Sequence, residues 1–331
     1  MKRTLRTLAC LALCLIFACC SALAQTTTIT DQAGREVTLE TPARRIVSCY
    51  YISTASLLAL GAEDQLAGIE MKADSRRLYQ LAAPQIIDLP AVGSGKGVNV
   101  EEIASIQPDV VILPVKLAAE AESLELLGIP VVIVDPETLE GYRDCVRLLG
   151  EIAGAEAQAS ALLDYYDEKH EEIAALTANA ERPLVYMSSG AGYLRTYPSG
   201  MYQHALIEAA GGINVAGDLE GATQADISAE QLIAWNPQYM FIVADADYTP
   251  KDVLEDSQLS TLDAVKNENI YEFPSDIEAW DYPTPSSILG LMYLTHILHP
   301  DLYTAEQYQA EAESFYRDFF GIEVSADDIG L

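Results

Sequence analysis

The sequence predicts an α/β protein with two lobes, each built on a central, mainly parallel sheet, joined by a single long rigid α-helix. Three observations support this prediction. Apolar, strand-like segments alternate with amphipathic, helix-like segments, which is typical of parallel strands with helical crossovers. The longest uninterrupted helical pattern lies mid-chain, at residues 155–178. Similar segments, each with a short helix, a proline and an apolar strand, occur before and after it.

The central helix is recognised by the spacing of its apolar and acidic residues. Apolar side chains recur at helical intervals, at Ala159, Leu162, Leu163, Tyr166, Ile173 and Leu176. About two dozen residues in this conformation would span about 36 Å, the width of a small domain. The acids between them, from Asp164 to Glu172, are predicted to form a solvated face without a binding role.

These patterns divide the chain into four parts. Residues 1–24 are predicted to be a signal peptide, 25–153 the N-terminal lobe, 154–179 the connecting helix and 180–331 the C-terminal lobe. A length of 331 residues suits two domains of about 150 residues each. No low-complexity linker separates the halves, so we expect the lobes to move little relative to each other.

The first 24 residues have a basic start, a short apolar run and a small-residue end, which is typical of a secretory signal. The apolar run is too short to span a bilayer. Export to the periplasm or the outer face of the cytoplasmic membrane is therefore predicted. Cleavage after Ala24 and lipid attachment at Cys19 or Cys20 are the two alternatives for the end of the signal.

The composition is that of a strongly acidic globular protein, with a net charge of −31 at pH 7 and half of the residues hydrophobic. Such a surface repels nucleic acid and anionic headgroups, which excludes nucleic-acid binding as the main activity. Beyond the signal, the cysteines are Cys49 and Cys145. Buried free thiols are expected for both, and whether they interact stays open.

In the N-terminal lobe, a hairpin-like pair of strands is expected first, followed by alternating strands and helices. The expected strands are 28–30, 36–39, 46–49, 66–70, 86–89, 110–113 and 131–134. A helix should follow the strand 46–49, with Ser53 or Thr54 near its cap and Gly61 at its end. Further helices are expected at 75–82, 100–106, 117–127 and 139–152.

In the C-terminal lobe the alternation resumes. Strands are expected at 184–188, 239–243 and 270–273, and helices at 202–210 and 229–234. An apolar helix should start at Pro283 and Pro285 and end at His299, and a last amphipathic helix should cover 305–320. In each lobe a Glu, Glu101 or Glu230, is followed seven residues later by a proline. This repeat suggests two similar lobes, although helix–proline–strand joints are common enough to arise by coincidence.

Ligands of parallel sheets bind at the carboxyl ends of the strands. Aromatic residues gather in the loops that this rule selects, at Tyr50, Tyr51, Tyr193, Tyr197, Tyr202, Tyr248, Trp280 and Tyr282. They could line a ligand site, or they could reflect the abundance of tyrosine in the chain. Basic residues also fall in these loops, at Lys72, Arg76, Arg77, Lys96 and Arg195. They suggest an anionic ligand, with salt-bridged surface loops as the alternative.

Motifs for catalysis or for a bound metal are weak. The glycine-rich segment 93–97 has neither the spacing nor the Ser/Thr of a nucleotide-binding loop. His296 and His299 fit packing or a helix cap better than a metal pair, and Asp245 and Asp247 fit a solvated loop. No catalytic residue, cofactor or metal ligand is predicted, and the sequence does not indicate an enzyme.

The chain resembles the substrate-binding proteins of ABC importers for ferric siderophores, haem and cobalamin. The resemblance covers nearly the whole mature chain and rests on ITDQAGREVTL, PARRIVSCYYISTASLLALGAEDQLAGI, NVEEIASIQPDVVIL, ALIEAAGGINVAG, ISAEQLIAWNPQYMFIV and PTPSSILGLMYLTHILHPDLY. It implies two α/β lobes joined by a long rigid helix, with a shallow ligand cleft between them. It also implies binding and delivery without covalent chemistry.

The resemblance implies a partner as well, an ABC permease with its ATPase, and a monomeric binding protein. A Glu on each lobe of the family meets basic residues of the permease. Glu101 and Glu230 match those positions, with Glu102 as the fallback for the first. Exposed acids at helix starts are also favoured by the helix dipole alone.

A metal chelate, with a ferric siderophore as first choice, is the ligand that the resemblance implies. The expected contacts are Tyr50, Tyr51, Lys96, Tyr193, Arg195, Tyr202, Trp280 and Asp281. Two departures keep the ligand open. The chain has Ala55 where many relatives have Glu, and the segment before NVEEI lacks the pattern typical of haem binders. In addition, WDYPTPSSILGL resembles a branch that includes molybdate and tungstate binders as well as predicted iron-chelate binders.

Several alternatives therefore remain. Molybdate, tungstate or cobalamin could be the ligand, with a small dry pocket expected for an oxyanion. A ligand sensor that works without a permease is another reading. An extracellular metal-dependent enzyme would need a convergent His/Asp/Glu set, and none of the four histidines lies in the selected loops.

Overall fold

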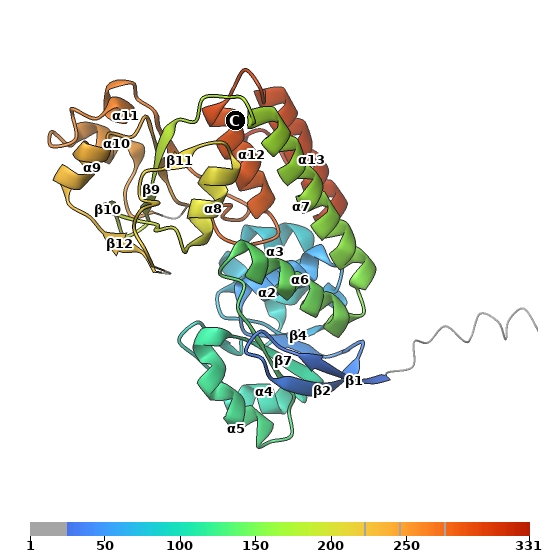
Figure 1. Ribbon diagram of the computed structural model, residues 1–331. Coiled ribbons are helices and arrows are strands. Elements are labelled where there is room, and N and C mark those ends of the chain that lie inside the picture. The colour runs from blue at the N-terminus through green and yellow to red at the C-terminus, as the bar shows by residue number, and fades with distance from the viewer. Residues whose placement is uncertain (1–24, 222, 245, 275) are drawn as a thin grey trace, which may run out of the picture.

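The computed structural model describes residues 25–331 except 222, 245 and 275, and it has the predicted two-lobe α/β architecture (Figure 1). The predicted signal peptide, with Cys19 and Cys20, lies outside the described residues. In the part that the structure describes, no helix has the length and apolar character needed to cross a bilayer.

The N-terminal lobe is built on a four-stranded parallel sheet with the order β4-β3-β7-β8. The strands are β3 (Ile46–Ser48), β4 (Leu66–Gly68), β7 (Val110–Pro114) and β8 (Val131–Val134). Every residue of β3, β7 and β8 is buried, because helices cover both faces of the sheet. The carboxyl ends of these strands meet at the edge that faces the C-terminal lobe (Figure 1).

Two apolar clusters lie on opposite faces of this sheet. Ile112 and Val132 pack in the cluster with α2 (Tyr51–Ala59) and α6 (Leu139–Ala153). The alternate strand residues pack in the cluster with α4 (Val100–Ile106) and α5 (Ala121–Glu125). The lobe also contains β1 (Gln25–Thr30), β2 (Glu36–Thr41), η1 (Glu63–Gln65), η2 (Ala73–Ser75), α3 (Arg77–Ala82), η3 (Pro84–Asp88), β5 (Gly93–Ser94), β6 (Gly97–Val98) and η4 (Val115–Glu120).

Cys49 and Cys145 are buried free thiols, as predicted. They belong to different apolar clusters, Cys49 with the α4 side of the sheet and Cys145 with the α6 side. Burial raises the pKa of both thiols well above the ordinary value.

Two sequence predictions in this lobe are wrong. The expected strand 86–89 is the 3₁₀ helix η3, which Pro84 begins and which buries Ile86. A short apolar run does not by itself distinguish these two structures. Ser53 and Thr54 do not cap α2, because the helix already begins at Tyr51 and both lie inside it. The Thr54 hydroxyl instead donates to Glu70 at 2.7 Å.

The C-terminal lobe has a mixed sheet with the order β12-β10-β9-β13-β14, and β11 also pairs with β9. β9 (Leu184–Ser189), β13 (Tyr239–Ile242), β14 (Ile270–Glu272) and β11 (Ile213–Asn214) are parallel. β10 (Gly192–Thr196) pairs antiparallel with β9, and β12 (Ala225–Asp226) pairs antiparallel with β10, so Tyr193 and Arg195 lie on a strand and not in the loop that the sequence suggested. Its helices are α8 (Tyr202–Ala209), α9 (Ala229–Trp235), α10 (Pro250–Glu255), α11 (Asp263–Lys266), α12 (Ser287–Leu298), α13 (Ala305–Phe320) and η5 (Asp327–Ile329).

The repeated segment forms the same structure in both lobes. α4 and α9 are each seven residues long, and the side chains of Asn99 and Ser228 cap their first turns. Both helices end at a residue with left-handed backbone, Gln107 at φ 53° and Asn236 at φ 44°. A proline and a parallel strand, β7 or β13, follow directly. The sequence repeat is therefore also a structural repeat.

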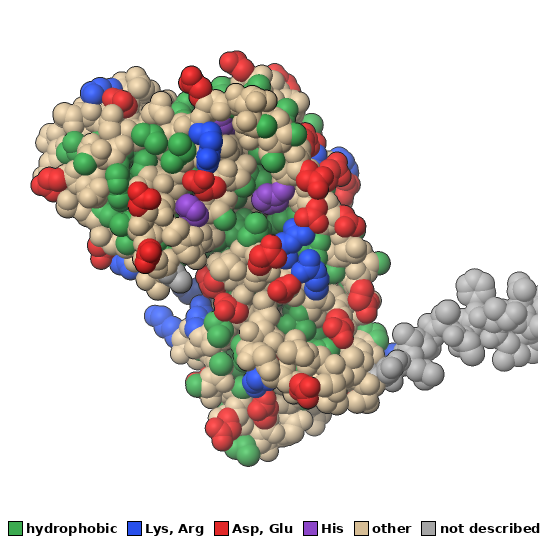
Figure 2. All heavy atoms as spheres, in the orientation of Figure 1, with side chains coloured by type: hydrophobic (Ala, Val, Ile, Leu, Met, Phe, Trp, Pro, Cys, Tyr) green, Lys and Arg blue, Asp and Glu red, His purple; other side chains and the backbone are tan. Residues whose placement is uncertain are grey.

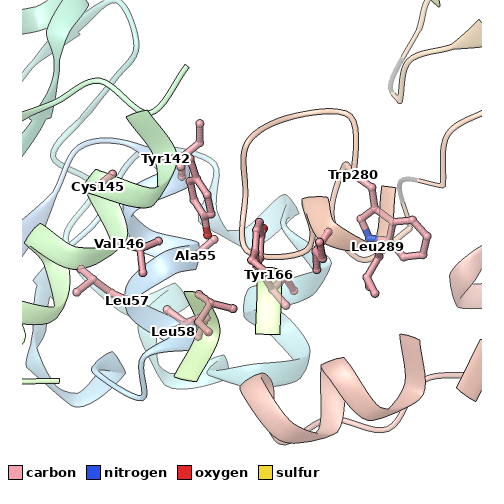
Figure 3. Close-up of a cluster of buried hydrophobic side chains, with 14 of the residues drawn as sticks. Ala55, Leu57, Leu58, Tyr142, Cys145, Val146, Tyr166, Trp280 and Leu289 are labelled. Carbon is pink, nitrogen blue, oxygen red and sulfur yellow. The ribbon is translucent and has the colours of Figure 1, made fainter. Parts of the chain in front are cut away.

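The connecting helix α7 (Glu156–Thr177) packs against α6 of one lobe and against α8 and α12 of the other. The Tyr166 ring lies 5.9 Å from the Tyr142 ring of α6 (Figure 3). Its hydroxyl lies 2.9 and 3.0 Å from the carbonyl oxygens of Thr284 and Pro285, and 2.9 Å from the Ser287 hydroxyl. One buried side chain thus contacts both lobes.

Replacement of Tyr166 by Phe should lower the free energy of unfolding by about 1–3 kcal/mol, because the buried carbonyls of Thr284 and Pro285 lose a donor. Tyr165→Phe is the matched control, since among the described residues the Tyr165 hydroxyl donates only to Glu311, at 3.2 Å in a partly buried position. Urea unfolding followed by circular dichroism measures both variants. Equal losses for the two variants would contradict the role given to Tyr166.

Candidate functional site

Two cavities lie between the lobes, one on each side of the adjacent residues Tyr50 and Tyr51. The first, the Arg76 chamber, has a volume of about 490 Å³ and is lined by Tyr51, Lys72, Arg76, Arg77, Glu278 and Tyr282, among others. The second, the Lys116 chamber, has a volume of about 500 Å³ and is lined by Tyr50, Lys116, Val134, Glu137, Met201 and Thr223, among others. The two chambers share no lining residue. The two tyrosine rings lie 5.2 Å apart in an edge-to-face arrangement.

In the Arg76 chamber, a guanidinium group is stacked on an aromatic ring. Cζ of Arg76 lies 4.5 Å from the centre of the Tyr51 ring, within the range of a cation–π contact. Arg77 is engaged elsewhere, in an ion pair with Asp328 at 2.6 Å. The C-terminal lobe adds Glu278, whose carboxylate accepts a hydrogen bond from the Ser286 N–H at 3.2 Å. Removal of this carboxyl group from water raises the pKa of Glu278 above its ordinary value, and the hydrogen bond only partly offsets that effect.

In the Lys116 chamber, Nζ of Lys116 lies 5.1 Å from the centre of the Tyr50 ring. The Tyr50 hydroxyl donates to Glu137 at 2.7 Å, which fixes the ring at the chamber wall. The other walls are largely apolar and include Pro114, Val115, Val134, Pro136 and Met201. The turn between β5 and β6 lies beside this lysine, since a Cβ atom on Gly95 would come within 3.1 Å of its Nζ.

Three lysines at the cleft lack a carboxylate partner. In the described chain, no carboxylate oxygen lies within 4.0 Å of Lys72, Lys96 or Lys116, although most other basic side chains form ion pairs. Lys72 lies in the segment after β4, Lys96 in the turn between β5 and β6, and Lys116 in the segment after β7. All three therefore lie at the strand-end edge of the N-terminal lobe. Figure 2 shows Lys and Arg side chains gathered at the notch between the lobes. In an otherwise acidic protein, this edge concentrates positive charge.

Three of the residues expected to contact the ligand lie in the core and line neither chamber. Trp280 is 1% exposed, and its indole N–H donates to the Tyr316 hydroxyl at 2.9 Å (Figure 3). Gly290 permits this packing, because a Cβ atom there would lie 2.4 Å from the Trp280 carbonyl oxygen. Asp281 is fully buried and accepts from the Ala244 N–H at 3.2 Å, and Tyr202 is also buried.

Two further residues expected at the site lie on β10, outside both chambers. The Tyr193 hydroxyl donates to Asp256 at 2.6 Å, and its ring packs edge-on against Tyr248. Arg195 lies 3.8 Å from Asp226 of β12. The structure therefore brings Tyr50 and Tyr51 together with Lys96 nearby, but it places the five residues expected from the C-terminal lobe away from the chambers.

Lys116 was missed by the sequence analysis. It follows Pro114 at the carboxyl end of β7, so the strand-end rule would have selected it had the loop after this strand been included. Arg76 was noted only as one of several basic residues, because its stacking on Tyr51 depends on the turn at η2, which the sequence pattern does not show.

In the described part of the chain, no three His, Cys, Asp or Glu side chains are placed to hold a metal ion. His296 faces the Tyr303 carbonyl oxygen at 2.9 Å, and His299 is buried at the end of α12. Asp245, one of the two acids considered for a cation, lies outside the described residues.

Glu101 and Glu230 are both exposed in the first turns of the repeated helices α4 and α9. Hydrogen bonds from its own backbone N–H and from the Ser228 hydroxyl lower the pKa of Glu230. Glu102, the fallback for the first position, is half-buried, and its N–H is bonded to the Asn99 cap.

The chain is similar to known binding proteins over most of its length. It is 25% identical to the molybdate-binding protein MolA of Haemophilus influenzae, over 91% of this chain and 92% of that protein. It is 27% identical to a vitamin B12-binding protein of Vibrio campbellii, over 71% and 82% of the two chains. The solved structure of MolA bound to molybdate has the same fold, with a TM-score of 0.79 at 23% identity, covering 90% of this chain and 99% of that one.

These relatives bind solutes and are not enzymes, in agreement with the sequence prediction. The family model for periplasmic binding proteins matches residues 46–277, from β3 through β14 and into the loop before α12. The match covers well over half of the chain, and the resemblance seen in the sequence is confirmed. The chain belongs to the periplasmic binding protein family.

Proposed function

We propose that the protein is the solute-binding component of an ABC importer and captures an anionic metal chelate, with a ferric siderophore as first choice. The observation that carries this proposal is a set of three lysines with no carboxylate partner among the described residues, which lie with Arg76 along a cleft that contains Tyr50 and Tyr51. Cationic groups would bind ligand oxygens, and the tyrosine rings would pack against flat ligand groups. The solute would be cargo for transport rather than a cofactor.

The size of the cleft favours a chelate over a bare oxyanion. An oxyanion is best held in a small pocket where hydrogen-bond donors surround it. The two chambers measure about 490 and 500 Å³, and one of them has largely apolar walls. Such space suits a ligand with anionic and apolar parts.

Molybdate is the second candidate, because the similarity to MolA extends over 91% of the chain. For this ligand, the Arg76 chamber is the better of the two, since Arg76 provides the planar donors that an oxyanion uses. The similarity to a vitamin B12-binding protein makes cobalamin a third ligand to include in binding tests.

Delivery to the permease would use Glu101 and Glu230. The two acids occupy equivalent positions of a repeated helix, one on each lobe, and both are exposed. A pair of acids held on two lobes can meet two basic sites on a symmetric or pseudo-symmetric partner. Export through the segment 1–24 would place the protein outside the cytoplasmic membrane, with a lipid anchor at Cys19 or Cys20 as one form.

Ligand charge tests the proposal directly. The iron(III) complex of a tris-catecholate, a trianion, should raise the melting temperature, whereas a cationic iron(III) trihydroxamate of similar size should not. Lys72→Gln and Lys116→Gln should each weaken binding of the trianion about 3- to 10-fold in calorimetry, because each removes a nearby positive charge. Lys251→Gln is the control, since this lysine is exposed on α10 and lies beside Glu255. Stabilisation by molybdate alone would favour the second candidate, and no stabilisation by any anion would refute the proposal.

The ionisation of Glu278 should make ligand affinity depend on pH. Its pKa is raised, so this carboxyl group becomes neutral at a higher pH than an ordinary Glu when the solution is acidified. The ionised form repels an anionic ligand, so binding takes up a proton and affinity should rise as the pH falls, by roughly 3- to 10-fold once Glu278 is neutral. Glu278→Gln should bind more tightly than wild type at pH 8 and lose this pH dependence. A wild-type affinity that falls toward pH 6 would contradict the prediction.

Charge reversal at the proposed docking acids should separate delivery from capture. Glu101→Lys and Glu230→Lys should reduce transport in a reconstituted importer by at least about tenfold, because like charges would face each other at the interface. The affinity for the solute should not change. Glu306→Lys is a matched control, because Glu306 is an exposed acid in the first turn of α13. Full transport by the double variant would contradict the docking role given to the two acids.

A further inference from the structure

A buried carboxylate, that of Glu70, lies directly behind the Arg76 chamber. Glu70 follows β4 and is 5% exposed. It accepts three hydrogen bonds, from the Thr54 hydroxyl at 2.7 Å, from the Tyr79 hydroxyl at 2.8 Å and from Nε of Arg76 at 3.1 Å. Thr54 belongs to α2 and Tyr79 to α3, so two helices hold the carboxylate in place.

Arg76 is held on two sides but keeps free donors. Its Nε donates to Glu70, and its Cζ lies 4.5 Å from the centre of the Tyr51 ring and 5.9 Å from the centre of the Tyr79 ring. Its two terminal nitrogens make no hydrogen bond to any residue that the structure describes. The side chain is 37% exposed and lines the chamber. The free end of the guanidinium group is therefore available to a ligand.

We propose that Glu70 is a positioning residue, which holds the Arg76 guanidinium in the orientation that receives the anionic group of the solute. This inference rests on the proposed function, because it assumes an anionic solute in the Arg76 chamber. An unrestrained arginine would lose rotamer freedom when the ligand binds, whereas Arg76 has already lost it in the unbound protein. The contact with Glu70 would thus raise ligand affinity although Glu70 itself touches no ligand.

A purely electrostatic role for Glu70 predicts the opposite result. A negative charge behind the Arg76 guanidinium group weakens the binding of an anion. Removal of that charge should therefore tighten binding. Removal of a positioning contact should weaken binding instead. The sign of the change in affinity therefore distinguishes the two roles.

Two variants of Glu70 test the sign of the change in ligand affinity. Glu70→Leu has a similar volume but offers no acceptor, and it should weaken binding of the iron(III) tris-catecholate about 3- to 10-fold in calorimetry. Glu70→Gln keeps an oxygen acceptor for Arg76 and should show a smaller loss. Unchanged or tighter binding by the folded variants would overturn the inference. If the Leu variant does not fold, the sign of the affinity change in the Gln variant decides between the positioning role and the electrostatic role.

A double-mutant cycle separates positioning from general destabilisation. In an Arg76→Ala background, Glu70→Gln should leave the affinity unchanged, because no guanidinium remains to be held. A loss of the same size in that background would overturn the inference. Asp31→Asn is the matched control, since Asp31 is also a buried carboxylate, 4% exposed and paired with Arg35 at 2.8 Å. It should lower stability and leave affinity unchanged.

The same measurements separate failure of this inference from failure of the proposed function. If wild-type protein binds neither the tris-catecholate complex nor molybdate, the proposed function fails, and the inference fails with it. If wild type binds the complex and the Glu70 variants bind it equally well, only the inference fails.

Discussion

The buried side chain of Tyr166 is the contact on which the relation between the two lobes depends. Its ring packs on α6 of the N-terminal lobe, and its hydroxyl contacts the Thr284–Ser287 turn before α12 of the C-terminal lobe. The surrounding apolar cluster is continuous from α2 and α6 through α7 to α12 and α13 (Figure 3). A cleft between lobes can keep a defined width only if the lobes share packed atoms outside the cleft, and this cluster supplies them.

The charge distribution assigns different tasks to different surfaces. The protein carries a net charge of −31, yet Lys72, Lys96 and Lys116 at the edge of the cleft have no carboxylate partner in the part of the chain that the structure describes. A local positive edge within a negative surface directs an anion to the cleft, because repulsion elsewhere disfavours other approaches. Glu101 and Glu230, at the starts of α4 and α9, expose negative charge on the same two lobes. Under the proposed function, the solute and the permease would therefore be bound by charges of opposite sign.

The sequence was sufficient for the architecture and only partly sufficient for the site. The buried strands β7 and β8 and the helix α13 have strong apolar patterns, and they were predicted within a residue or at the observed bounds. The segment 86–89 was wrong because four apolar-rich residues fit a strand and a 3₁₀ helix equally well. The strand-end rule selected several loops that line the two chambers, but it did not predict the direction of their side chains. Trp280 and Tyr202 lie in such loops or at their ends, yet their rings are buried in the core. The Arg76–Glu70 contact depends on how the η2 turn folds back toward Tyr51, which no local pattern encodes.

Tyr50 and Tyr51 are neighbours in the chain but face different chambers, and no residue lines both chambers. A substitution in the wall of one chamber therefore leaves the wall of the other intact. Under the proposed function, a change in one chamber would alter part of the solute preference, while the other chamber would keep its contacts with the solute. The cargo could then change by single steps, each of which preserves part of the binding energy.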